Sequence, residues 1–269
     1  MKQKWTELDI ESSGYGISAP LSRNVNLLGT LLGRAVQEQG GDDKYDIVED
    51  LRVRCKEAAR RDDDELRREI FEDLSELSLD EIVWLLRAYA AFFHLVNKAE
   101  QLEITRINRE RAKVARKEKP RTESIAAAVH QLKEEGHSMD QVLDLLGRLD
   151  IQPTLTAHPT EARRRSILFK QQKIASLLAR LLFRDVTPNE NEETIEDIYT
   201  QIALLLTTDE IRAERPTVLD EVRHGLYFFG SSIWETVPHI VRDVKDAIEL
   251  YYDQRPDIPQ FLRYRSWIG

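Results

Sequence analysis

Residues 149–168 read LDIQPTLTAHPTEARRRSIL, and the period of the apolar residues changes within this stretch. Its first part, up to Ala157, has β-branched residues and a proline but no helical stripe, which predicts a short strand at about 151–157. A helical pattern resumes at Thr160 and continues to about Phe183. A strand that leads into a helix is the repeating unit of a β/α barrel, so this stretch decides the expected fold.

Helical patterns fill most of the chain on either side of this stretch. Before it, apolar residues spaced three or four apart predict a helix that ends at Gly40–Gly41; they are Leu21, Val25, Leu28, Leu32 and Val36. Ser78 and Glu81 have the spacing of a capping box and predict the start of a long helix that Pro120 stops. After the stretch, further helices are expected to about residue 253.

A second strand is predicted at about 261–267, where Phe261, Tyr264 and Trp267 take the inward positions of an alternating pattern. Two such strands, far apart in the sequence, do not form a stable sheet alone. We therefore expect a mainly α-helical chain that is the N-terminal part of a larger β/α barrel enzyme. Its expected parts are a flexible tail at 1–20, a helical region at 21–150, and the start of the barrel at 151–269, truncated at its second strand.

The composition excludes several classes of protein. The net charge of −9 and the pI of about 5.3 argue against a nucleic-acid binder. Cys55 is the only cysteine, so neither an intramolecular disulfide nor a cysteine-based metal site is expected. No apolar run approaches the roughly 18 residues that span a bilayer, and the N-terminus lacks the apolar segment of a secretory signal. We expect a cytoplasmic protein with no nucleic-acid or membrane partner.

His158 follows the predicted strand directly, at the position where β/α barrels place their chemistry. The start of the next helix offers backbone N–H groups and a partial positive charge, which suit a phosphate or a carboxylate. Arg163, Arg164 and Arg165 follow at intervals of about 100° around that helix, so at most two face one site. From these residues alone, His158 is either an acid–base residue beside an anion site or a polar residue at a turn.

LTAHPTEARRRSIL at 155–168 resembles the first active-site signature of the phosphoenolpyruvate carboxylase family, and its TAHPTE core is highly specific. Four more segments are similar to parts of this family: LSRNVNLLGTLLG (21–33), AFFHLVNKAEQ (91–101), TTDEIRAERPTVLDEVRHGLYFFGSSIWETVP (207–238) and RYRSWIG (263–269). The last is similar to the lead-in to the family's SWMGGDRDGNP motif. Because the chain stops before the GDRDGNP portion, we expect it to be an N-terminal fragment that is inactive alone.

The resemblance implies an anaplerotic, carbon-fixing reaction of phosphoenolpyruvate with bicarbonate that requires Mg²⁺ or Mn²⁺ and no biotin. Bicarbonate attacks the phosphate, which gives carboxyphosphate and the enolate of pyruvate. Carboxyphosphate releases CO₂, and the enolate captures it to form oxaloacetate, with phosphate as the other product. The catalytic role that carries over to His158 is to take the carboxyl proton of carboxyphosphate and to help hold the CO₂. An ordinary histidine pKa of about 6.5 suits such a proton transfer near neutral pH.

The resemblance also implies an anionic allosteric effector. Arg164 and Arg165 match an arginine pair that, in plant-type members, is proposed to bind a sugar-phosphate activator together with an arginine of the DEIR segment, here Arg212. The metal ligands of the family are expected outside this chain, and the intact enzyme is expected to be a homotetramer. Two alternatives are a non-catalytic helical regulatory or scaffold domain and a histidine phosphotransfer module. The second places its histidine within a helix, whereas Pro159 puts His158 at a helix start.

Overall fold

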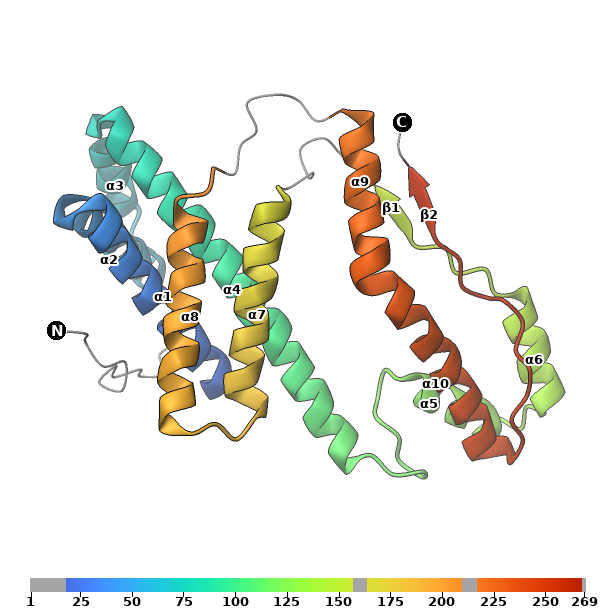
Figure 1. The fold of residues 1–269 in the computed structure, drawn as a ribbon. Helices are drawn as coiled ribbons and strands as arrows, with labels where there is room; N and C mark the ends of the chain where they lie inside the picture. Colours follow the sequence, from blue (N-terminus) through green and yellow to red (C-terminus); the bar gives the residue numbers. More distant parts are fainter. Residues whose placement is uncertain (1–17, 157–163, 210–216, 268–269) are drawn as a thin grey trace. The chain divides into compact units, whose positions relative to one another are not determined.

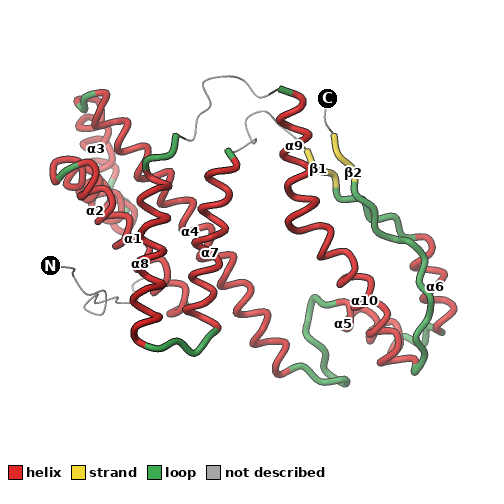
Figure 2. The backbone as a smooth tube through the Cα atoms, in the orientation of Figure 1, coloured by secondary structure: helices red, strands yellow, loops and turns green. Residues whose placement is uncertain are grey.

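The computed structural model describes residues 18–156, 164–209 and 217–267, and this part of the chain is mainly α-helical, as predicted (Figures 1 and 2). The elements in chain order are α1 (Ala19–Gly40), α2 (Asp42–Arg61), α3 (Asp64–Glu76), α4 (Leu79–Val114), α5 (Ile125–Glu134), α6 (Met139–Arg148), β1 (Thr154–Thr156), α7 (Arg165–Phe183), α8 (Pro188–Leu206), α9 (Val218–Phe228), the π-helical segment η2 (Phe229–Ile233), α10 (Trp234–Tyr252) and β2 (Arg265–Trp267). None of the described helices has the length and apolar content that crossing a bilayer requires.

The chain divides into two compact units that are not continuous in sequence. The first unit contains residues 1–106 and 164–210, and the second contains residues 107–163 and 211–269. The boundary expected at residue 150 would group α7 and α8 with the strands. In the structure these two helices belong to the first unit, because they pack with α1. The expected tail at 1–20 lies outside the described residues up to residue 17, but Ser18 caps α1 and the helix begins at Ala19.

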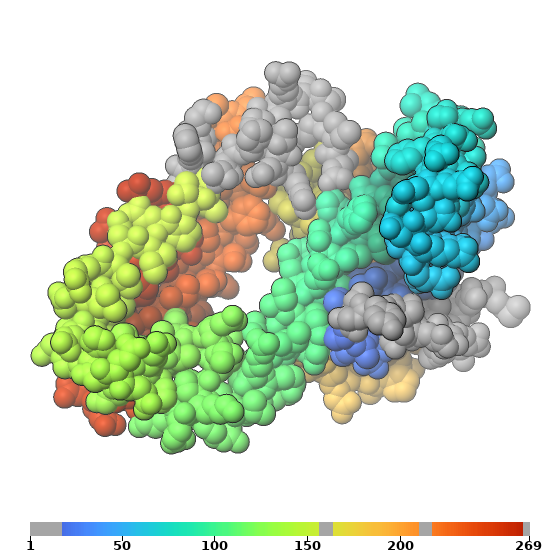
Figure 3. Space-filling view, turned by 180° about the vertical axis from the view of Figure 1, so that it is seen from behind, coloured from blue at the N-terminus to red at the C-terminus, as the bar shows by residue number. Residues whose placement is uncertain are grey.

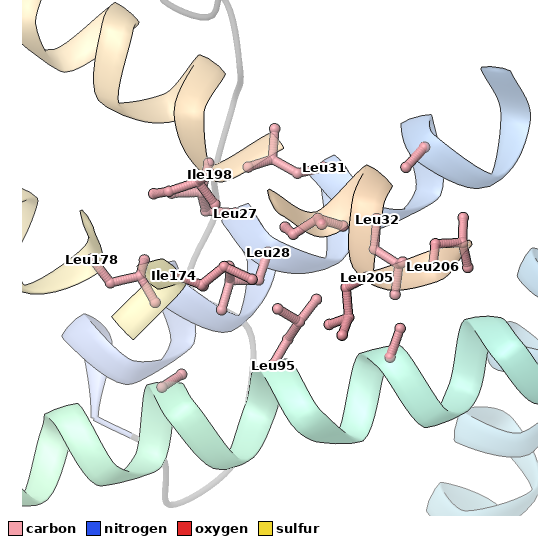
Figure 4. Close-up of a cluster of buried hydrophobic side chains, with 14 of the residues drawn as sticks. Leu27, Leu28, Leu31, Leu32, Leu95, Ile174, Leu178, Ile198, Leu205 and Leu206 are labelled. Atoms are coloured by element: carbon pink, nitrogen blue, oxygen red, sulfur yellow. The ribbon is translucent and has the colours of Figure 1, made fainter. Parts of the chain in front are cut away.

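The core of the first unit lies between α1, α4, α7 and α8 (Figure 4). Leu28 and Leu31 of α1, Leu95 of α4, Ile174 of α7 and Ile198 of α8 are all almost completely buried. The stripe predicted on α1 faces this core: Leu28, Leu32 and Val36 are buried, and Leu21 and Val25 pack at its edge. The helical period therefore identified the buried face correctly.

Polar contacts join the same helices at the edge of this core. The Tyr199 hydroxyl of α8 donates a hydrogen bond to Glu38 of α1, and the Arg34 guanidinium lies 5.4 Å from the centre of the Tyr199 ring. At the other end of α1, the Ser18 hydroxyl donates to the buried Glu103 carboxylate of α4 at 2.6 Å. These contacts fix α1 against α8 and α4.

A second, smaller core lies in the second unit between α5, α6, α10 and the segment that leads into β2. Val129, Val142, Ile248 and Phe261 are buried in it. Tyr251 is buried beside them, and its hydroxyl donates to the Lys117 carbonyl at 2.8 Å. This bond attaches the turn that follows α4 to α10.

α4 ends earlier than the sequence pattern predicted. We expected Pro120 to stop the helix, but the helix ends at Val114. Arg116 and Lys119 then exchange two backbone hydrogen bonds of 3.0 and 3.1 Å across a tight turn. The bond from Tyr251 to Lys117 holds this turn, so a tertiary contact overrides the local helical preference.

The helical region expected to continue to about residue 253 is interrupted after α9. The widened segment η2 separates α9 from α10. It contains Gly230, Ser231 and Ser232, and Pro238, which cannot donate a backbone hydrogen bond, lies in the first turns of α10. Helices are most often irregular at such residues.

Candidate functional site

The candidate site starts from the pair of strands, which lies in the second unit. β1 and β2 are parallel, with Thr154 opposite Arg265 and Thr156 opposite Trp267. The Arg265 N–H donates to the Pro153 carbonyl at 3.1 Å, and an additional bridge joins Ile151 to Leu262. Both strands fall within the predicted ranges. Because they are parallel, their carboxyl ends lie at the same edge, which is where α/β proteins bind ligands.

His158 follows this edge in sequence, two residues after the end of β1 at Thr156. His158 itself lies outside the described residues, as do Arg163 and Arg212. The structure therefore describes the strand that precedes the histidine in the sequence and, in the other unit, the helix that follows it. The predicted catalytic role of His158 remains a prediction.

The two remaining candidate residues lie at the start of α7, in the first unit. Arg164 is the N-cap residue, with extended backbone angles, and Arg165 is the first helical residue. The Arg164 carbonyl accepts hydrogen bonds from the N–H groups of Ile167 and Leu168 at 3.0 and 3.2 Å. Arg164 is half-buried and Arg165 is exposed. The predicted start of this helix at Thr160 is wrong: the helix begins at Arg165, because Arg164 before it has extended backbone angles.

The charge at the start of α7 favours an anion. No acidic residue lies in its first turn, and among the described residues the N-cap Arg164 makes no capping hydrogen bond with its side chain. The start of a helix carries a partial positive charge, and the two arginines add formal positive charge to it. Ile167, one turn later, is buried in the first core and anchors this end of the helix.

α9 begins just after the segment that contains Arg212. Thr217 is its N-cap residue. The Thr217 hydroxyl and N–H donate hydrogen bonds to the Asp220 carboxylate at 2.8 and 3.0 Å, and the Asp220 N–H donates one to the Thr217 hydroxyl at 3.3 Å. The next residue, Glu221, is only 4% exposed, and its Oε2 atom has no hydrogen-bond partner in the described structure. The sequence analysis missed Glu221. The sequence did contain a signal for it: residues 220 and 221 are both acidic, and the helix cap requires only the first of them.

A metal site is not evident in the described ranges, where no group of three or more His, Cys, Asp or Glu side chains could hold an ion. Cys55 is exposed on α2. The described residues therefore offer an edge of parallel strands and a cationic helix start, and they offer no cluster of metal ligands.

Comparison with known proteins gives a consistent result. The family model described as phosphoenolpyruvate carboxylase matches residues 21–269. A curated relative of that name from Rhodothermus marinus is 56% identical over 262 residues, which are 97% of this chain and 28% of the relative. Relatives of the same name from Thermus thermophilus and Roseiflexus castenholzii are 38% and 35% identical over 93% and 94% of this chain. The chain thus spans between 27% and 28% of the length of these three relatives.

Proposed function

The chain belongs to the phosphoenolpyruvate carboxylase family, and from this premise we propose that it contributes to the conversion of phosphoenolpyruvate and bicarbonate into oxaloacetate and phosphate. The observation that carries the proposal is the TAHPTE motif, which starts at Thr156, the last residue of a strand in a parallel pair. Because the chain spans 28% of its Rhodothermus marinus relative, we further propose that it does not catalyse the reaction alone.

The role that we assign to His158 is proton transfer. Bicarbonate attacks the phosphorus of phosphoenolpyruvate, and the bond from phosphorus to the enol oxygen breaks, which leaves carboxyphosphate and the enolate. The neutral His158 imidazole takes the carboxyl proton of carboxyphosphate, whose C–O bond to phosphate then breaks and releases CO₂. The imidazolium returns the proton to the phosphate, while the enolate carbon attacks CO₂ to form oxaloacetate.

We propose Mg²⁺ or Mn²⁺ as the metal of the reaction and no role for biotin. A divalent cation would stabilise negative charge on oxygen as a Lewis acid. The described residues contain no cluster of ligands that fits such an ion, so no step is assigned to it. A cytoplasmic location and a homotetrameric enzyme belong to the same proposal.

The proposal is tested by His158→Asn in the full-length protein that carries this sequence. Asparagine cannot accept the proton, so kcat for oxaloacetate formation should fall by a factor of about 10² to 10⁴. His137→Asn is the matched control, because His137 is exposed and its nearest ionic contact is Glu135 at 3.7 Å. Wild-type turnover in His158→Asn would refute the assigned role.

Arg164, Arg165 and Arg212 are proposed as ligands of an anionic effector. The cationic start of α7 supports the first two. A full-length variant with Arg164→Ala and Arg165→Ala should need a higher sugar-phosphate concentration for half-maximal activation. Arg184→Ala, an exposed position at the other end of α7, is the control. An unchanged activation curve in the double variant would remove the effector assignment and leave the carboxylase proposal intact.

A further inference from the structure

The backbone hydrogen bonds change their spacing where α9 passes into α10. The Phe229 N–H is shared between the carbonyls of Gly225 and Leu226, four and three residues before it. The Trp234 N–H donates to the Phe229 carbonyl, five residues before it. Helical segments with this wider spacing are rare, are usually a single turn long, and often lie at functional sites. The change makes η2 a weak point in a rod of helix that otherwise runs from α9 to the end of α10 (Figure 1).

Three residues in and after η2 weaken the same stretch. The Thr236 hydroxyl donates to the Ser232 carbonyl at 2.7 Å, and side-chain bonds of this kind bend helices. Pro238 has no N–H group, so the Trp234 carbonyl lacks the helical bond that it would otherwise accept. Gly230 adds backbone freedom, because glycine loses more conformational entropy in a helix than any other residue. The backbone between residues 229 and 238 is therefore held less firmly than a regular helix of that length.

The second core holds α10 but not α9. Of the eleven residues of α9, only Glu221 is buried. On α10, by contrast, Val244, Ile248 and Tyr251 are buried against α5 and α6. In Figure 3, the green and yellow-green residues of α5 and α6 lie in front of the red end of α10. A helix that buries few apolar side chains moves more readily than one that is part of a core.

One ring contact links η2 to the second strand. Phe229, the first residue of η2, meets the Tyr264 ring edge to face, with the ring centres 6.1 Å apart. Tyr264 directly precedes β2. The neighbouring Phe228 instead contacts two rings within α9. A change in the direction of α9 at η2 would therefore act on the start of β2 through Phe229.

We propose that η2 is a hinge on which α9 turns relative to α10, and that this hinge transmits the binding of an anionic effector to β2. The segment that directly precedes α9 in the sequence contains Arg212, which the proposed function assigns to the effector. Because Thr217 caps the start of α9, a displacement of that start moves the helix as a unit. The turn at η2 then changes the contact of Phe229 with Tyr264. The hinge is independent of the proposed function, whereas the role of the effector rests on it.

Amide hydrogen exchange, measured by mass spectrometry on the full-length protein that carries this sequence, tests the hinge. The amides of residues 230–237 should exchange at least about tenfold faster than those of residues 244–252. Gly230→Ala should slow the first group about two- to fivefold, because alanine favours a regular helix. A Cβ atom at this position would meet no neighbour within 4 Å, so the change introduces no clash.

Gly225→Ala is the matched control. A Cβ atom there also meets no neighbour within 4 Å, but the residue lies in the regular part of α9. This variant should leave the exchange of residues 230–237 unchanged. Equal exchange of the two groups of amides in the wild-type protein would overturn the hinge, and so would equal effects of the two glycine variants on residues 230–237.

Steady-state activation of the full-length enzyme, with glucose 6-phosphate as the probe, tests the transmission. The measured quantity is the ratio of turnover with and without the probe, in which a loss of folded enzyme cancels. Phe229→Leu should lower this ratio at least about twofold, because leucine lacks the ring edge that meets Tyr264. Gly230→Ala should lower it as well, because a stiffer hinge passes on less movement. Phe228→Leu is the control and should keep the wild-type ratio.

The outcomes separate the two steps from the proposed function. A wild-type ratio in both Phe229→Leu and Gly230→Ala would overturn the transmission, even where the Arg164→Ala and Arg165→Ala double variant loses activation. If glucose 6-phosphate does not activate the wild-type enzyme, the effector assignment and the transmission both fail. In that case the exchange experiment still decides whether η2 is a hinge.

Discussion

Glu103 is a buried carboxylate on which two parts of the first unit converge. It is 4% exposed, accepts two hydrogen bonds from Arg106 at 2.7 and 2.8 Å, and accepts one from the Ser18 hydroxyl at 2.6 Å. Ser18 is also the N-cap of α1, because its oxygen accepts a bond from the Leu21 N–H at 3.2 Å. One side chain of α4 thus supports the start of α1.

Glu103→Gln is expected to lower the free energy of unfolding by about 1–3 kcal/mol at pH 7, because a neutral amide cannot replace both bonds to the Arg106 guanidinium. Urea denaturation measures the change. Glu110→Gln is the control: Glu110 pairs with Lys113 at the surface, where removal of an ion pair costs at most about 1 kcal/mol. Equal losses in both variants would show that the burial of Glu103 has no energetic consequence.

The same residue predicts a pH dependence. Hydrogen bonds from Arg106, and to a smaller extent from Ser18, lower the pKa of Glu103 below its ordinary value of 4.5, although burial acts in the opposite direction. Its stabilising contribution is therefore present above pH 4.5 and is lost as the pH falls through the lower pKa of the folded state. The difference in unfolding free energy between wild type and Glu103→Gln should shrink as the pH falls below 4.5. A constant difference over this range would contradict the explanation.

Among the elements, α8 shows how strongly a short motif defines a helix start. Thr187 is its N-cap residue, and Pro188 is the first helical residue. The Thr187 N–H and hydroxyl each donate a hydrogen bond of 2.9 Å to the Glu190 carboxylate. Thr187→Ala should lower the free energy of unfolding by about 1 kcal/mol. Thr200→Ala, on an exposed position of the same helix, should change it by less than about 0.5 kcal/mol. Thermal unfolding of both variants measures the difference, and an equal effect would argue against the cap.

Most elements could be predicted from local signals. The Ser78–Glu81 capping box starts α4 as expected, with the Ser78 N–H donating to Glu81 at 2.7 Å. The strands at 151–157 and 261–267 were also predicted, because their period differs from that of the helices. What local signals could not show is the end of α4 at Val114. That end depends on Tyr251, which lies more than 130 residues away in the sequence.

For the site, sequence similarity supplied more than residue patterns did. Periodicity located the strand edge before His158, but it started the next helix at Thr160 rather than at Arg165, and it did not decide whether the histidine reacts. Burial of Glu221 could not be predicted, since its neighbour Asp220 explains the acidic pair as a helix cap. Burial of a polar group is a property of the packed chain rather than of a local pattern.

At the scale of the whole molecule, the order of the helices in the sequence does not show which helices pack against one another. An apolar stripe shows which face of a helix is buried and not which helix it contacts. The region expected to begin a barrel at residue 151 therefore contributes α7 and α8 to the core of α1 and α4, while β1 and β2 belong to the other unit. Each unit has its own buried cluster, so each is expected to have its own local stability.

This expectation can be tested with one cavity in each core. Leu95→Ala in the first core and Ile248→Ala in the second should each lower the free energy of unfolding by about 2–5 kcal/mol. Amide hydrogen exchange should accelerate mainly in α1, α7 and α8 in the first variant and mainly in α5 and α10 in the second. The two variants remove similar side chains from fully buried positions, so each is the matched control of the other. If both variants accelerate exchange equally in all of these helices, the two units unfold as one, and the continuous α4 helix that runs from residue 79 to residue 114 would be the element that couples them.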